Sequence, residues 1–547
     1  MNRRSFLKTV AAAGAVSATG AALRPRLSAA VQTLPANAAD LQIVLQPQQA
    51  GAVISPQLYG HFIEHLGGVI YDGIWVGRDS KIPNIDGIRR QFVDDMKAIG
   101  APNLRWPGGC FADGYHWRDG IGPAAKRRKT YNYWQRGTPE EVRGFETNQF
   151  GTHEFMRLCR LTGAEPYLAG NVGSGTVQEF HEWVDYCNAA PNTLSLAEER
   201  AANGDRAPFN VRYWGVGNES WGCGGDMSPQ EYAQQYRQFV TQFPNHLRPF
   251  LVATGPRGHS NDHDVGWTKG FFEAMQGGHR SRVDGFSLHF YTDFRQTRFK
   301  AATFTPPQWY SVLLKGATIE QAILQNWEVL AQFDPQHQTK FIVDEWGNWY
   351  PPGEEIAPGF TISQPITLRD ALHTAVTFDI FNRHADKIAM ANVAQTINCL
   401  HSLFLAHEDK FVRTPVYHVF QLYRPHMGAK LVPLRIGGGD LTVAAEEGSA
   451  KLARLHGSAS LNAARVLTVT LSNPSLESAV TAQLHLEGAA ATEATAQVLT
   501  HEDRQAANTF AQPNQIGLAR LPVATDGANV RLKLPPQSVV AVSLPLS

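Results

Sequence analysis

The apolar positions of this chain alternate between two patterns over its central part. From about residue 54 to residue 394, short continuous apolar runs are each followed by a loop and then by apolar residues at helical spacing. Nearly continuous apolar strands that alternate with helices are typical of parallel sheets covered on both faces. We expect these strands at residues 57–62, 103–106, 165–169, 211–216, 250–254, 285–290, 341–344 and 388–391.

Eight such units predict an α/β fold, a closed (β/α)8 TIM barrel, rather than an open doubly wound sheet. The glycine fingerprint of a dinucleotide site does not follow the first strand, which also favours the barrel. We expect no cofactor. Thr176 and Ser228 each precede a Glu by three residues, a spacing that predicts capped helix starts. Gly100 and Gly163 predict helix ends.

The helical pattern stops near residue 424. Residues 466–471, 482–486 and 530–534 alternate or run as apolar strands separated by turn residues, which predicts a C-terminal antiparallel, jelly-roll-like β-sandwich. We expect an early strand, within residues 39–55, to join this sandwich. The predicted division is therefore a barrel over residues 56–424 and a sandwich over residues 425–547.

The first 38 residues have the pattern of an export signal. Arg3 and Arg4 precede a short run rich in Ala, which indicates a twin-arginine signal peptide and an exported, periplasmic or secreted protein. No later segment is apolar for long enough to span a membrane. Because 49 Lys and Arg balance 49 Asp and Glu without a long basic block, nucleic acid is not an expected partner.

The cysteine pattern indicates neither a disulfide framework nor a zinc site. The five cysteines are Cys110, Cys159, Cys187, Cys223 and Cys399, an odd number with no paired spacing. At least one is therefore unpaired within the chain. Export of an already folded chain would suit cysteines that stay reduced.

Polar side chains gather where the predicted strands end, and in a barrel these ends surround the active site. They are Glu64, Arg105, Cys110, Asn218, Glu219, His289, Tyr291, Asp344, Glu345, Trp346, Asn392 and Gln395. Carboxylates and amides among indole rings are typical of a sugar site. Glu219 and Glu345 follow the fourth and seventh strands, so they can face each other as the two carboxyl groups that glycoside hydrolysis needs. Alternatively, Glu345 only pairs with Arg105.

Five blocks of sequence resemble the signature motifs of the family 51 α-L-arabinofuranosidases. They are YGHFIEH from Tyr59, LRWPGGCF from Leu104, GNVGSGT from Gly170, YWGVGNESWGCGG from Tyr213 and VDEW from Val343. The resemblance implies a retaining, exo-acting glycosidase that removes arabinofuranosyl residues from arabinose-containing glycans, needs no metal, and forms a homo-oligomer.

The resemblance also implies a role for each site residue. Glu219 is the expected acid/base and Glu345 the nucleophile, about 5 Å apart. The expected substrate contacts are Asn218 at the 2-hydroxyl, Glu64, Tyr291 and Gln395 at other hydroxyls, Arg105 and His289 beside the nucleophile, Trp349 at the rim, and Cys110, where some members carry Asn. Trp134 is a further candidate for the pocket mouth.

Three other interpretations stay open at this point. His61, Glu64 and His65 match H-x-x-E-H, an inverted zinc-protease motif, although the glycines around it leave little room for the helix that this motif needs. The two glutamates could instead serve an endo-acting glucanase or xylanase. The chain could also be a glycan-binding protein without catalytic activity.

Overall fold

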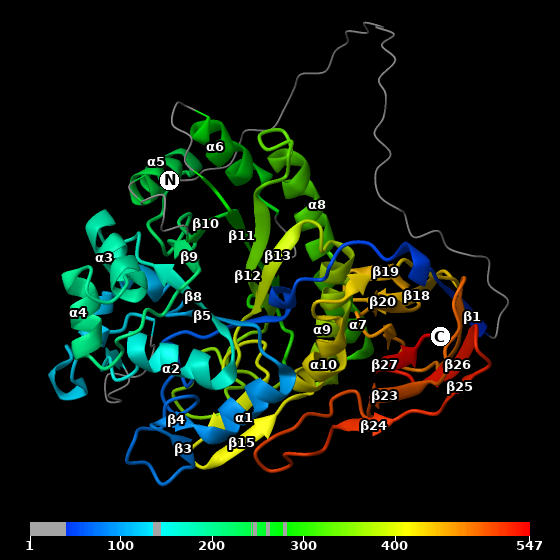
Figure 1. Cartoon of the computed structure of the whole chain (residues 1–547). Coiled ribbons are helices and arrows are strands. Elements are labelled where there is room, and N and C mark those ends of the chain that lie inside the picture. Colours follow the sequence, from blue (N-terminus) through cyan, green and yellow to red (C-terminus); the bar gives the residue numbers. More distant parts are fainter. Residues whose placement is uncertain (1–39, 135–143, 242, 244–248, 259–262, 277–281) are drawn as a thin grey trace, which may run out of the picture.

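The computed structural model confirms the TIM barrel (Figure 1). It describes residues 40–547 except 135–143, 242, 244–248, 259–262 and 277–281, so the predicted signal at residues 1–38 lies outside the described residues. Eight parallel strands close in chain order, each paired with the next and the last with the first. They are β2 (Gly60–Phe62), β5 (Asn103–Trp106), β8 (Glu165–Gly170), β9 (Tyr213–Val216), β10 (Phe250–Ala253), β11 (Gly285–Asp293), β12 (Lys340–Trp349) and β13 (Ile388–Val393).

The barrel strands differ from the predicted ones mainly in length. Residues 57–59 were expected in the first strand but belong to a 3-10 helix, Pro56–Tyr59, so β2 is only three residues long. In contrast, β11 and β12 continue several residues beyond the predicted ends and stay paired up to Asp293 and Trp349. Tyr291 and Trp349 therefore lie within the paired ends of β11 and β12 rather than in loops.

Helices cover the outside of the barrel, and their ends carry the predicted signals. Thr176 Oγ1 accepts a hydrogen bond from the Glu179 amide, and Ser228 forms a capping box with Glu231. Gly100 and Gly163 end helices with φ of 67° and 81°, a conformation that favours glycine. The helices are α1 (Arg90–Ile99), α2 (Thr152–Thr162), α3 (Val177–Asn188), α4 (Ser195–Ala202), α5 (Pro229–Val240), α6 (Val265–Met275), α7 (Pro306–Ala317), α8 (Ile319–Leu330), α9 (Leu368–Arg383) and α10 (Pro415–Tyr423).

The C-terminal part is a β-sandwich of two sheets with its own apolar core. One sheet has the order β17 (Leu434–Ile436), β1 (Asp40–Leu45), β22 (Val480–Leu486), β26 (Asn529–Leu534) and β25 (Val523–Thr525). The other has the order β16 (Lys430–Leu431), β20 (His456–Leu461), β21 (Val466–Asn473), β27 (Ser538–Pro545), β23 (Thr495–Leu499) and β24 (Leu518–Arg520). The N-terminal strand β1 thus lies inside the sandwich, where it runs parallel to β22, while the other pairs are antiparallel.

Barrel and sandwich pack together through helices on one side of the barrel. Figure 1 shows the sandwich beside α9 and α10, and α7 contacts a hairpin formed by β18 (Asp440–Ala445) and β19 (Gly448–Ala453). The contact includes buried polar bonds: Ser458 Oγ and Tyr423 Oη both donate to Asp379 Oδ1, at 2.7 and 2.9 Å. These buried bonds help to join the sandwich to the barrel helices α9 and α10.

Three short hairpins complete the described part of the chain. They are β3 (Asn84–Ile85) with β4 (Ile88–Arg89), β6 (Thr130–Tyr131) with β7 (Phe145–Glu146), and β14 (Phe404–His407) with β15 (Lys410–Arg413). None of the helices in this part is long and apolar enough to cross a membrane.

Candidate active site

Two carboxylates approach each other at the mouth of the barrel. Glu219 lies in the loop after β9, and Glu345 lies within β12. One oxygen of each, together with a ring nitrogen of His289, falls within a set of atoms that all lie within 4.8 Å of one another. Glu219 has a φ of 40°, an unfavourable conformation for a residue with a side chain, and such strain is often found at functional sites. This upper bound is consistent with the short carboxyl separation of retaining glycosidases, about 5 Å, and is below the longer one of inverting enzymes.

Glu345 is buried but surrounded by groups that favour its ionised form. Arg105 Nη1 donates to its Oε1 at 2.8 Å, and Tyr291 Oη donates to its Oε2 at 2.7 Å. Burial alone would raise the pKa of Glu345, but the positive charges of His289 and Arg105 and the bond from Tyr291 outweigh it and lower that pKa. The expected pairing with Arg105 therefore exists, and it prepares an ionised carboxylate in the cavity.

The surroundings of Glu219 differ from those of Glu345. His289 Nδ1 lies 3.0 Å from its Oε1 and 3.5 Å from Glu345 Oε2, so this ring bridges the two carboxylates. Burial by itself would lower the pKa of His289, yet the two carboxylates raise it. The Glu219 side chain is 19% exposed and that of Glu345 only 8%. Glu219 is thus the more exposed of the two carboxyl groups.

Two of the five cysteines are paired, a point that the sequence left open. Cys110, in the loop after β5, and Cys223, in the loop after β9, form a disulfide, although 113 residues separate them. Their sulfurs lie 3.6 and 3.4 Å from Glu219 Oε2. Closure of the barrel brings the two loops together, which no local spacing in the sequence reveals. Cys159, Cys187 and Cys399 are buried and unpaired.

A cavity of about 1230 Å³ opens above the two carboxylates. Of the predicted site residues, seven line it: Glu64, Cys110, Glu219, Tyr291, Glu345, Trp349 and Gln395, and Trp134 lines it as well. Arg105, Asn218 and His289 are not among the residues that line the cavity. Arg105 and His289 contact the two carboxylates, and Arg105 Nη2 also donates to Asn218 Oδ1 at 2.6 Å. The strand-end residues Asp344, Trp346 and Asn392 are not among the residues that line the cavity.

Glu64 forms the far end of the cavity floor. Its Oε1 accepts the amides of Gly109 and Phe111 at 2.9 and 3.1 Å, and its Oε2 accepts Gln395 Nε2 at 2.7 Å. Burial and the nearby charge of Glu345 raise its pKa to about 7. Among the described residues, Gln395 Oε1 is buried and accepts no hydrogen bond, so it can accept one from a sugar hydroxyl.

Asp113 binds backbone amides in the loops that follow β8 and β9, including the loop that carries Asn218 and Glu219. Its carboxylate accepts the amides of Val172, Gly173 and Asn218 at 3.0 to 3.1 Å. Gly109 lies beside the cavity, and a Cβ there would come within 2.7 Å of Glu345 Oε1. The glycine-rich loops are therefore needed because backbone and carboxylates approach each other closely.

Sequence reasoning did not predict several residues of the cavity wall. Trp221, Arg257, Arg295 and most of the segment from residue 350 to 364 also line it. The Arg295 guanidinium lies 4.1 Å from the centre of the Trp349 ring, and the Arg257 guanidinium lies 5.8 Å from that of Trp221. Trp221 follows the Asn218–Glu219 motif closely, which was a usable signal, whereas the segment 350–364 carries no motif.

The zinc-protease interpretation fails on geometry. His61 lies in strand β2, where its ring stacks on Phe420, and both ring nitrogens are buried without a partner among the described residues. His65 Nδ1 pairs with Glu146 instead, and Trp106 Nε1 donates to its Nε2. The two histidines therefore do not share the helical face that such a zinc site requires.

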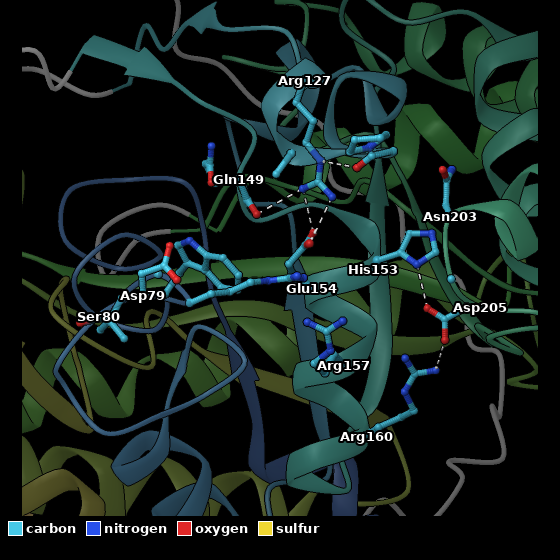
Figure 2. Close-up of a pocket in the computed structure, with 18 of the residues that line it drawn as sticks. Asp79, Ser80, Arg127, Gln149, His153, Glu154, Arg157, Arg160, Asn203 and Asp205 are labelled. Carbon is cyan, nitrogen blue, oxygen red and sulfur yellow. Dashed lines mark hydrogen bonds and ion pairs between the residues drawn. The ribbon is translucent and has the colours of Figure 1, made fainter.

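A second cavity, of about 660 Å³, lies beside α2 (Figure 2). Its charged side chains pair with one another: Arg127 with Glu154, and His153 and Arg160 with Asp205. It shares no lining residue with the cavity above Glu219 and Glu345.

Comparisons with known proteins agree with this geometry. Two family models match the chain, "Alpha-L-arabinofuranosidase 1 domain" over residues 95–298 and "Alpha-L-arabinofuranosidase C-terminal domain" over residues 344–538. A protein of Bacteroides ovatus named an intracellular exo-alpha-L-arabinofuranosidase is 36% identical over 92% of this chain and 95% of its own length. The chain belongs to the family 51 α-L-arabinofuranosidases.

Solved structures support the same family. The GH51 arabinofuranosidase of Xanthomonas axonopodis pv. citri is 38% identical, with a TM-score of 0.85 over 92% of this chain and 99% of that one. The arabinose complex of the Thermotoga maritima α-L-arabinofuranosidase is 28% identical, with a TM-score of 0.79 over 92% and 100%. The enzyme is therefore a glycoside hydrolase, and the interpretation as a binding protein without catalytic activity is wrong.

Proposed function

We propose that the enzyme removes terminal, non-reducing α-L-arabinofuranosyl residues from arabinose-containing oligo- and polysaccharides, with retention of configuration. The observation that carries this proposal is the pair of carboxylates, which approach within 4.8 Å but have unlike surroundings. Glu345 is ionised by its neighbours and can attack, while Glu219 is partly exposed and can exchange protons.

The reaction proceeds in two steps. Glu219, protonated, gives its proton to the glycosidic oxygen while a Glu345 oxygen attacks the anomeric carbon, which forms a covalent arabinosyl ester and releases the rest of the glycan. Glu219, now ionised, then takes a proton from water as that water attacks the anomeric carbon. The ester breaks, arabinose leaves, and both carboxyl groups return to their initial state.

The remaining predicted residues bind and orient. Glu64 and Gln395 take sugar hydroxyls at the cavity floor, and Asn218, held by Arg105, takes the 2-hydroxyl. Arg105, His289 and Tyr291 orient the nucleophile, and Trp349 forms the rim. Cys110 lines the cavity with a disulfide sulfur and not with a free thiol.

Azide rescue of two alanine variants tests the assignment. Glu219→Ala should lose turnover most on substrates with poor leaving groups. On an aryl arabinofuranoside with a good leaving group, azide should restore turnover by attacking the ester and yield an arabinosyl azide of retained configuration. Glu345→Ala with azide should yield the inverted product, because azide then attacks the substrate directly. Glu64→Ala is the matched control: it loses binding, and azide does not rescue it.

The choice of substrate tests the specificity. We expect turnover of an aryl α-L-arabinofuranoside that exceeds turnover of the aryl β-D-xyloside and β-D-glucoside. A preference for either pyranoside, or identical azide products from the two variants, would overturn the proposal.

We also propose export by the twin-arginine route, with the signal at residues 1–38. The Cys110–Cys223 disulfide supports it, since stable disulfides are typical of oxidising compartments. The Bacteroides ovatus relative is named intracellular, so export would distinguish this chain from it. Fractionation of the source cells, with N-terminal sequencing of the mature enzyme, tests the route, and light scattering of that sample tests the proposed homo-oligomer.

A further inference from the structure

The Cys110–Cys223 disulfide forms part of the cavity wall at the proposed acid/base. Both sulfurs are half-buried and line the cavity, so solutes in the cavity can reach them. They lie 3.6 and 3.4 Å from Glu219 Oε2. His289 holds the other oxygen, Oε1, at 3.0 Å, which leaves Oε2 turned toward the sulfurs.

The distances from Glu219 Oε2 to the two sulfurs fit those between the ligands of a tetrahedral thiophilic cation, whereas the sulfurs are bonded to each other and must move apart after reduction. For zinc bound by thiolate at about 2.3 Å and carboxylate at about 2.1 Å, tetrahedral angles place sulfur and oxygen about 3.6 Å apart. The two observed sulfur–oxygen distances are 3.6 and 3.4 Å, and one ligand atom of each residue lies within 4.8 Å of the others. The open cavity leaves a fourth position for water.

We propose that reduction of the Cys110–Cys223 disulfide creates a site for Zn²⁺ or a similar thiophilic cation, with the two thiolates and Glu219 as ligands. A small dithiol supplies the two electrons: its two thiols become a disulfide, and Cys110 and Cys223 each gain a hydrogen. The cation then replaces the two thiol protons, which are released. In the oxidised enzyme the sulfurs carry no ionisable proton, and this site does not form.

Metal binding in this form would stop turnover, a consequence that rests on the proposed role of Glu219. A carboxylate bound to the cation has no proton to give to the glycosidic oxygen. General acid catalysis typically contributes about 100-fold or more, so we expect at least that loss when the reduced enzyme is saturated with metal. The disulfide therefore protects the acid/base from metal capture.

The test compares oxidised and reduced full-length enzyme. The protein is treated with dithiothreitol, freed of it by gel filtration without oxygen, and titrated with CdCl₂, whose thiolate complexes absorb in the ultraviolet, and with ZnCl₂. We expect one equivalent of Cd²⁺ to give a thiolate band and to abolish arabinofuranosidase turnover in the reduced enzyme alone. A chelator should restore turnover.

The double variant Cys110→Ser/Cys223→Ser is the matched control, because it keeps the three buried cysteines. Added metal should leave the turnover of this variant, whatever its level, unchanged and should give no thiolate absorption band. If the variant does not fold, the oxidised wild-type enzyme serves as the control. Equal bands in the control and the reduced enzyme, or a full band without loss of turnover, would overturn the inference. Failure of the proposed function is distinct, since the untreated enzyme would then not hydrolyse the arabinofuranoside.

Discussion

Removal of one hydroxyl group, in Tyr291→Phe, should move the acid limb of the pH–rate profile to higher pH. Tyr291 Oη donates to Glu345 Oε2 at 2.7 Å, and the only atom that the substitution removes is this oxygen. The ring stays, so its edge-to-face contact with Trp349, with ring centres 5.1 Å apart, stays too. The variant thus changes the electrostatics of the nucleophile with little change in packing.

The size of the shift follows from the donors around Glu345. A hydrogen bond to a charged group contributes about 1.5–3 kcal/mol, and one pKa unit corresponds to about 1.4 kcal/mol, so the upper range is about one to two units. Arg105 at 2.8 Å and His289 at 3.5 Å remain and keep the pKa of Glu345 low. We therefore expect a shift of about one unit. The sign is upward because the lost bond favoured the ionised form.

The assay is kcat/KM for an aryl α-L-arabinofuranoside as a function of pH, which reports ionisations of the free enzyme. Tyr423→Phe is the matched control: its hydroxyl also donates to a buried carboxylate, Asp379, at 2.9 Å, but at the contact with the sandwich. That variant should lose stability and keep the acid limb in place. An unmoved limb in Tyr291→Phe, a shift to lower pH, or an equal shift in the control would refute the reasoning.

Two further variants test the supports of the site. Asp113→Ala removes the acceptor of three loop amides. We expect urea unfolding to show a free energy of unfolding lower by about 2–4 kcal/mol, together with reduced turnover. An unchanged unfolding midpoint would show that water replaces the carboxylate without cost. Trp349→Ala removes the ring on which Arg295 stacks at 4.1 Å, so KM should rise about tenfold while kcat changes less. A large loss of kcat with constant KM would instead place Trp349 among the groups that stabilise the transition state.

The sequence predicted the barrel because its strands are long apolar runs separated by capped helices. The order of those strands then determined which residues meet at the mouth, since the ends of parallel strands lie at one face. Glu219 and Glu345 could therefore be paired across 125 intervening residues, without any local sequence signal that links them.

The pattern could not predict how side chains divide between the cavity and the wall behind it. Arg105 precedes the cavity residues Gly109 and Cys110 in one motif, and His289 lies two residues before Tyr291, yet neither Arg105 nor His289 lines the cavity. Beside His289 the pairing of β11 with β12 has an irregularity, between Ser287 and His289, that the sequence pattern does not reveal. The disulfide between Cys110 and Cys223 depends on the distance between two loops, which exists only after the barrel closes. The segment 350–364 lines the cavity by its backbone course and carries no chemical motif.

The shared imidazole of His289 links the two steps of the proposed reaction. In the free enzyme its Nδ1 lies 3.0 Å from a Glu219 oxygen and 3.5 Å from a Glu345 oxygen, so a protonated ring interacts with both carboxylates. When Glu345 becomes an ester its negative charge disappears, and the charge of His289 acts on Glu219 alone. This change favours the ionised form of Glu219 at the stage when it must take a proton from water. The ring therefore couples formation of the ester to the change of Glu219 from acid to base.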